Sequence, residues 1–67
     1  MTDMKFLLLE LNGEGDPCHT YMAKSPVGMF ATLEKALERG YQMLHDKEAD
    51  DFEVYELLET GEFEFVY

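Results

Sequence analysis

The sequence predicts an α+β domain of order ββαββ, in which a four-stranded antiparallel sheet with strand order 2-1-3-4 carries one helix on one face. Three observations support this fold class. Residues 32–47 have the period of an amphipathic helix, residues 4–11 form a nearly continuous apolar run, and residues 52–67 read as a hairpin. At 67 residues, the chain is expected to form a single small domain over residues 1–67.

The N-terminal part is predicted to be a hairpin. Residues 4–11 are interrupted only by Lys5 and Glu10, which indicates a strand that is covered on both faces or lies centrally in the sheet. Residues 12–17, NGEGDP, are rich in turn formers, and residues 18–24 contain β-favouring side chains. The helix then returns the chain so that the third strand lies beside the first.

The helix is expected over residues 32–47, after an irregular connection at residues 25–31 that contains a proline and a glycine. Thr32 is placed to accept a hydrogen bond from the first turn. The apolar stripe that should face the sheet consists of Leu33, Ala36, Leu37, Gly40, Tyr41 and Leu44. A glycine inside a helix costs about 1 kcal/mol relative to alanine, so we expect a close approach of helix and sheet at Gly40.

The C-terminal hairpin is predicted from residues 52–58 and 62–67, which flank Thr60-Gly61 as a two-residue turn. Glu59 then pairs with Glu62. The next pairs on the face under the helix are Leu58–Phe63, Glu56–Phe65 and Val54–Tyr67, beside Phe52. The opposite, open face should combine apolar and acidic side chains, an arrangement typical of a contact surface: Phe6, Leu8, Glu10, Tyr21, Glu53, Tyr55, Leu57, Glu62, Glu64 and Val66.

The charge of the chain is strongly negative. Fifteen acidic residues stand against five basic ones, for a formal net charge of −10, and no basic residue follows Lys47. A field of this sign repels nucleic acids and anionic membranes, so we expect neither as a direct partner. The acidic end also contains many aromatic and aliphatic residues, which predicts a folded segment and not a disordered tail.

The same composition predicts a cytoplasmic protein, in the host cytoplasm if its source is viral. Cys18 is the only cysteine, so no disulfide can form within the chain, and a lone thiol suits a reducing compartment. The apolar run near the start is too short for a signal peptide, and no stretch reaches membrane-spanning length.

No catalytic or metal-binding pattern emerges from the sequence. Cys18 and His19 are adjacent on a predicted strand and point to opposite faces, so they do not share a metal ion easily with His45. The run at residues 46–51 lacks the spacing and central glycine of a calcium loop. The negative field disfavours a reactive thiolate, and no phosphate-binding loop is present. We therefore expect no enzyme activity, no metal and no cofactor.

Two functional hypotheses remain. In one, the protein is a homodimeric or accessory subunit that uses its open sheet face, and the acids provide solubility. In the other, the carboxylates occupy the basic, nucleic-acid-binding surface of a partner protein, because alternate residues of a strand project anions about 6.6 Å apart. The residues predicted to contact that partner are Glu10, Glu53, Tyr55, Leu57, Glu62 and Glu64, with Glu34 and Glu38 on the helix.

In size, acidity and lack of a catalytic motif, the chain resembles the small phage-encoded inhibitors that mimic DNA or block a nucleic-acid-binding enzyme, including anti-CRISPR and anti-restriction proteins. The resemblance lies in composition and length, and it assigns no role to an individual residue. It implies an inhibitor or decoy that acts by binding protein.

Overall fold

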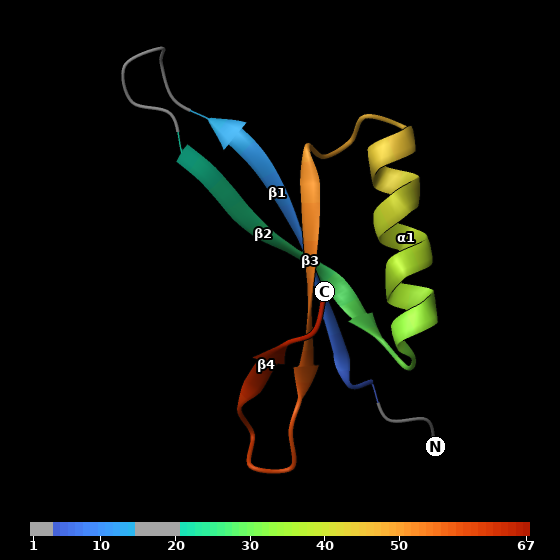
Figure 1. Ribbon diagram of the computed structural model, residues 1–67, viewed down its shortest axis with the longest axis vertical. Coiled ribbons are helices and arrows are strands. Elements are labelled where there is room, and N and C mark those ends of the chain that lie inside the picture. The colour runs from blue at the N-terminus through green and yellow to red at the C-terminus, as the bar shows by residue number, and fades with distance from the viewer. Residues whose placement is uncertain (1–3, 15–20) are drawn as a thin grey trace.

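The computed structural model of the chain describes residues 4–14 and 21–67 (Figure 1). Its elements in chain order are the strands β1 (Phe6–Glu14) and β2 (Tyr21–Phe30), the helix α1 (Leu33–His45), and the strands β3 (Asp51–Leu57) and β4 (Phe63–Phe65). The strands form one antiparallel sheet in the order β2-β1-β3-β4, and α1 packs on it. The predicted α+β fold class and strand order are confirmed.

The β1–β2 hairpin is longer than predicted and extends away from α1 (Figure 1). The segment predicted to be an irregular connection is the second half of β2. Leu8 pairs with Gly28 and Leu9 with Pro26, which leaves Val27 as the extra residue of a β-bulge. A proline can lie here because β2 is an edge strand and because a bulge interrupts the ladder. The prediction took this proline and glycine as the end of the strand.

The predicted turn at residues 12–17 is also wrong in its first half, since residues 12–14 belong to β1. Residues 15–20, to which the prediction assigns the rest of the turn and the start of the second strand, lie outside the described residues. The backbone N–H of Gly13 donates a hydrogen bond to Oδ2 of Asp50 at 2.7 Å. This contact ties the far half of β1 to the segment between α1 and β3.

The helix covers the side of β1 that was predicted to be open. Leu8 is fully buried and pairs with Val54, which is also fully buried. Phe6 packs against the same core cluster, so it lies with Leu8 and Glu10 on the helix side. These three residues are not on the open face. Because β1 is apolar on both of its faces, the alternation of its residues cannot indicate which face meets the helix.

The helix begins and ends close to the predicted residues. Oγ1 of Thr32 accepts a hydrogen bond from the backbone N–H of Lys35 at 3.2 Å, as predicted for a helix cap. Met43, at the edge of the predicted stripe, is only 1% exposed and lies in the core, whereas Tyr41 is half exposed. The hydroxyl of Tyr41 is hydrogen-bonded to that of Tyr67.

Gly40 lies where α1 touches the ring of Phe52. A Cβ atom at Gly40 would lie 2.6 Å from two carbons of that ring, which is too close for any side chain. The ring has little freedom to move away, because Tyr67 stacks on it at a centroid distance of 5.5 Å and the Tyr41 ring is nearly perpendicular to it at a centroid distance of 5.2 Å. The predicted close approach of helix and sheet at Gly40 is confirmed.

The register of β3 and β4 differs by one residue from the predicted one. Gly61 has a φ of +90°, and its N–H donates to the carbonyl of Leu58 at 2.9 Å, while the N–H of Leu58 donates to the carbonyl of Glu62 at 2.8 Å. The turn therefore contains three residues, with a glycine in the bulge position that requires positive φ. The observed pairs are Leu57–Phe63, Glu56–Glu64 and Tyr55–Phe65.

A second irregularity at the end of the chain restores one predicted pair. The N–H groups of Val66 and Tyr67 both donate to the carbonyl of Val54, at 2.9 and 3.2 Å, and Val54 N–H donates to the carbonyl of Tyr67. Two residues thus oppose one, as in a β-bulge. Val66 packs against the core and not on the open face, and Tyr67 lies beside Phe52 near the middle of the sheet (Figure 1).

The Gly40 contact generates a stability prediction. Gly40→Ala is expected to lower the free energy of unfolding by about 1–2 kcal/mol, because the clash with Phe52 outweighs the gain in helix propensity. In a domain of this size, that is a drop in Tm of roughly 5–15 °C, measurable by circular dichroism. Gly28→Ala is the matched control, since a Cβ there meets nothing within 4 Å, and its Tm should not fall. A Gly40→Ala protein as stable as the parent would contradict the prediction.

Candidate functional site

Three carboxylates lie on the helix side of the β3–β4 hairpin, and we call Glu56, Glu62 and Glu64 the hairpin carboxylates. Glu56 is directly opposite Glu64 in the register. Glu56 shares its face with Phe6, its partner on β1, which packs against the core. Glu62 precedes Glu64 by two positions and so lies on the same side. Like charges directly opposite one another destabilise a strand pair, so strand pairing does not account for this arrangement.

No basic side chain offsets the hairpin carboxylates within the described parts of the chain. The ion pairs there join Lys24 with Glu53 at 3.1 Å and Arg39 with Glu48 at 3.3 Å, and the histidine contact is between His45 and its neighbour in sequence. Glu62 and Glu64 are exposed to solvent. The cluster is thus a concentrated negative region on strands whose positions are fixed by backbone pairing.

Glu53 does not belong to this cluster, although it was predicted to lie beside Glu62 and Glu64. It lies on the opposite side of the sheet, where its carboxylate contacts the amine of Lys24 and accepts a hydrogen bond of 2.6 Å from the hydroxyl of Tyr55. The Tyr55 hydrogen bond is the largest cause of a lowered Glu53 pKa, and Lys24 adds to it. The hydrogen bond to Glu53 raises the pKa of Tyr55. The hydrogen bond of Lys24 to Glu53, together with the negative charge of Glu53, raises the pKa of Lys24. Glu53 is therefore a compensated charge.

The remaining residues predicted to contact a partner fall into separate regions. Glu10 lies on the helix side of β1, opposite Phe52. Glu34 and Glu38 are exposed on α1, and Glu34 is in its first turn, where the helix dipole favours a carboxylate. Tyr55 and Leu57 lie on the other side of the sheet with Glu53. Apart from Glu53, the structure thus places the predicted acidic contacts on the helix side of the sheet and the predicted apolar contacts on the other side.

The side of the sheet away from α1 carries an apolar row beside the charged residues Lys24, Asp51 and Glu53, and we call this side the open face. One row crosses all four strands through Met29, Leu7, Tyr55 and Phe65. Beside this row lie Leu9, Leu57 and Phe63. Phe63 and Phe65 are 48% and 58% exposed, and Phe65 contacts Tyr55 edge to face at 5.7 Å. Exposed aromatic side chains gathered in this way are typical of an interaction surface.

Sequence reasoning missed Phe63 and Phe65 as surface residues because it placed them under the helix. The signal that could have identified them is Gly61 itself. A glycine at the third loop position is the mark of a three-residue hairpin turn, and this turn shifts every later side chain to the other face.

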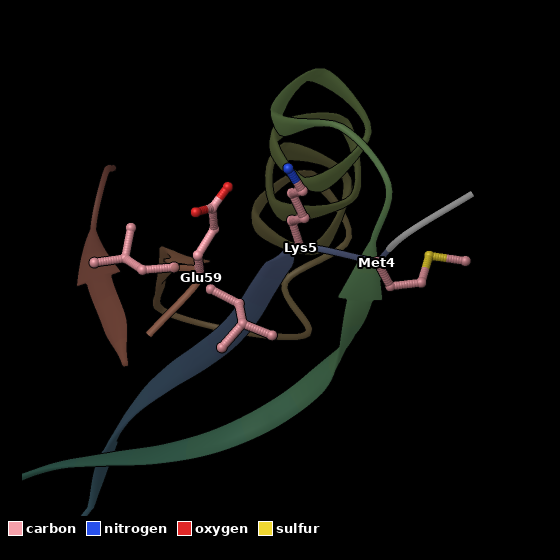
Figure 2. Close-up of a pocket in the computed structure, with 5 residues that line it drawn as sticks. Met4, Lys5 and Glu59 are labelled. Atoms are coloured by element: carbon pink, nitrogen blue, oxygen red, sulfur yellow. The ribbon is translucent and has the colours of Figure 1, made fainter. Parts of the chain in front are cut away.

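A shallow hollow of about 290 Å³ lies at one end of the sheet and is lined by Met4, Lys5, Leu57, Leu58 and Glu59 (Figure 2). Its volume is at the lower limit for small-molecule sites. Among the described residues that line it, the titratable side chains are Lys5 and Glu59, whose polar ends rise on the same side of the hollow (Figure 2). This pair gives no arrangement that identifies a reaction.

Within residues 4–14 and 21–67, no group of three or more His, Cys, Asp or Glu side chains is arranged to hold a metal ion. Cys18 and His19, the adjacent pair considered as metal ligands, lie outside the described residues. The described part of the chain also contains no helix long and apolar enough to span a membrane.

Comparisons of the chain with protein families, with curated proteins and with solved structures found no match. The functional interpretation therefore depends on the two surfaces themselves.

The Glu53 contacts generate a pH prediction. Tyr55→Phe removes the hydrogen-bond donor, so the pKa of Glu53 should rise toward its ordinary value of 4.5, as followed by NMR titration of the side-chain carboxyl. Because the folded pKa of Glu53 is lowered, its contribution to stability is complete above pH 4.5 and is lost as the pH falls through the folded value. The stability difference between the parent and Tyr55→Phe should shrink in that acidic range. An unchanged Glu53 pKa in the variant would refute this assignment.

Proposed function

We propose that the protein is a non-enzymatic binding module that inhibits or masks a partner by occupying its basic, nucleic-acid-binding surface. The observation that supports this proposal is the direct opposition of Glu56 and Glu64 on paired strands, with Glu62 on the same side. Because this pair of like charges weakens the hairpin, it does not serve the stability of the fold, and a role in binding explains it.

The geometry of the hairpin carboxylates suits a surface built to bind phosphates. Side chains opposite each other on antiparallel strands are about 4.5–5.5 Å apart, and alternate residues of one strand are about 6.6 Å apart. Arginine and lysine side chains that line a nucleic-acid groove can pair with carboxylates as well as with phosphates, and arginine can do so in a bidentate manner. A folded array also binds without the entropy loss of ordering a flexible acidic tail.

The overall field strengthens this interaction at a distance. The net charge of −10 attracts a basic partner and raises the association rate, an effect that salt screens within about 10 Å at 0.1 M. Glu34 and Glu38 are exposed on α1, which covers the same side of the sheet, and they add to the negative charge on that side. We place this activity in the cytoplasm, where a lone cysteine stays reduced.

A homodimeric or accessory subunit is the second candidate function. Phe63 and Phe65 on the open face favour it. Both aromatic side chains are about half exposed, and the free energy falls when a partner protein covers them.

The acidic-surface proposal predicts opposite effects on stability and on binding. The triple variant Glu56→Gln, Glu62→Gln and Glu64→Gln should melt at or above the parent Tm, because a like-charge pair is removed. It should lose the basic partners that the parent chain retains in an affinity pull-down, and moderate salt should release those partners from the parent. Added duplex DNA or RNA should compete with the parent chain for the same partners.

The matched control is Glu53→Gln, which removes a charge from the other side of the sheet where Lys24 already compensates it. This variant should retain the partners. If the triple variant binds as the parent does, or if nucleic acid does not compete, the proposed function is wrong.

A further inference from the structure

The strand β4 forms one edge of the sheet, and among the described strands none pairs with its outer side (Figure 1). The N–H of Leu58 donates to the carbonyl of Glu62, so these two residues are a hydrogen-bonded pair. Hydrogen-bonded and non-hydrogen-bonded pairs alternate along an antiparallel ladder, so Glu64 is the next residue whose N–H and C=O face β3. The backbone N–H and C=O groups of Phe63 and Phe65 therefore point outward from the edge.

The opposite edge of the sheet, which β2 forms, is interrupted. Pro26 has no N–H to donate, and the bulge at Val27 breaks the regular spacing of the backbone groups. Both features are typical of edges that are protected against the addition of a strand. The run Phe63–Phe65 contains neither a proline nor a bulge, so β4 is the edge that can accept one.

We propose that β4 adds an extended strand of the partner protein in which apolar and basic side chains alternate. This proposal rests on the proposed function and specifies how the basic partner is held. Residues directly opposite each other on antiparallel strands share one side of the sheet. Apolar side chains opposite Phe63 and Phe65 lie on the open face, and an arginine or lysine opposite Glu64 meets the hairpin carboxylates. Backbone hydrogen bonds supply affinity in this mode, and the alternate side chains supply specificity.

The two sides of β4 identify the chemistry of the added strand. Phe63 and Phe65 are 48% and 58% exposed on one side. Glu62 and Glu64 are exposed on the other, and no basic side chain within residues 4–14 and 21–67 forms an ion pair with either. A second copy of β4 is a poor occupant. Two such strands that pair with their aromatic sides together also bring their carboxylates together, which is unfavourable.

Two synthetic peptides of equal composition test the proposal. One alternates valine and lysine over about eight residues, and the other contains the same residues in blocks of like type. Electrostatic attraction to the hairpin carboxylates depends on the lysines, which the two peptides have in equal number, whereas strand addition needs the alternation. We expect the alternating peptide to bind the intact chain with a Kd lower by roughly tenfold or more, as measured by isothermal titration calorimetry.

A proline substitution isolates the contribution of the backbone. Phe63→Pro removes an outward N–H at the first residue of β4, a position at which a strand tolerates proline. Phe63→Ala is the matched control, because it removes the same ring and retains the N–H. The proline variant should bind the alternating peptide roughly tenfold more weakly than the alanine variant. Equal affinities of the two variants, both folded by circular dichroism, would contradict strand addition.

Amide hydrogen exchange of the parent chain needs no variant. Without peptide, the amide of Glu64 should be protected by its pairing with β3, whereas those of Phe63 and Phe65 should exchange rapidly. The alternating peptide should slow exchange at both phenylalanines by roughly tenfold or more and should change Glu64 little. Exchange at the two phenylalanines that stays as fast with the peptide as without it would overturn the proposal.

The outcomes separate strand addition from the proposed function. If both peptides bind equally and the triple glutamine variant of the hairpin carboxylates loses both, the carboxylates bind basic groups without an added strand, and strand addition alone is wrong. If neither peptide binds, strand addition is again overturned. The proposed function fails only when the triple variant still captures the basic partner or when nucleic acid does not compete for it.

Discussion

The three-residue turn that ends at Gly61 determines which side chains of the C-terminal hairpin face the helix. Its positive φ lets the chain reverse with Leu58 paired to Glu62, so Phe63 follows on the open face and Glu64 on the helix side. A two-residue turn would exchange these two sets of side chains completely, because side chains alternate along a strand. Both candidate surfaces, the hairpin carboxylates and the open face, depend on this backbone conformation at a single glycine.

The contact between Gly40 and Phe52 has a similar role in the core. It brings the helix close enough to the sheet for the Phe52 ring to fill the space between them, and the Tyr67 ring stacks on its other side. The bulge that opposes Val66 and Tyr67 to Val54 makes this stacking possible, since it returns Tyr67 to the helix side after the turn has shifted the register. The end of the chain thereby becomes part of the core.

The fold could be predicted because its main signals are local and redundant. The apolar stripe of the helix, the cap at Thr32 and the glycine at the helix–sheet contact each indicate the same element, and short connections then restrict the strand order. The faces of the strands could not be predicted as well. Because β1 is apolar on both sides, the alternation of its side chains does not show which side meets the helix. The turn at Gly61 is one residue longer than the predicted turn, which reverses the faces of β4.

The errors in the candidate site follow from the same two causes. The prediction placed Glu53 beside Glu62 and Glu64, because a register error of one residue puts Glu62 and Glu64 on the wrong side of the sheet. In the structure, Glu62 and Glu64 lie on the same side as Glu56. The Lys24–Glu53 contact joins residues of β2 and β3, which are separated by β1, and no spacing in the sequence indicates it. Pro26 and Gly28 led to the prediction that the second strand ends before them, although both lie within β2. Bulges and edge strands tolerate residues that usually end a strand.

The position of the carboxylates distinguishes a binding role from a role in solubility better than their number does. Acids that serve only to keep a protein soluble are equally effective at any exposed position, and many such positions lie on the outer surface of α1, where Glu34 and Glu38 are found. Opposing Glu56 and Glu64 across a two-strand ladder is the costly choice, because each raises the energy of the other at a distance fixed by the backbone. That cost falls on a domain whose core contains few fully buried side chains, the largest being Leu8, Met43 and Val54. In the function that we propose, a partner that brings positive charge to this side of the hairpin removes the repulsion on binding, so the repulsion between the carboxylates in the free protein contributes to the affinity.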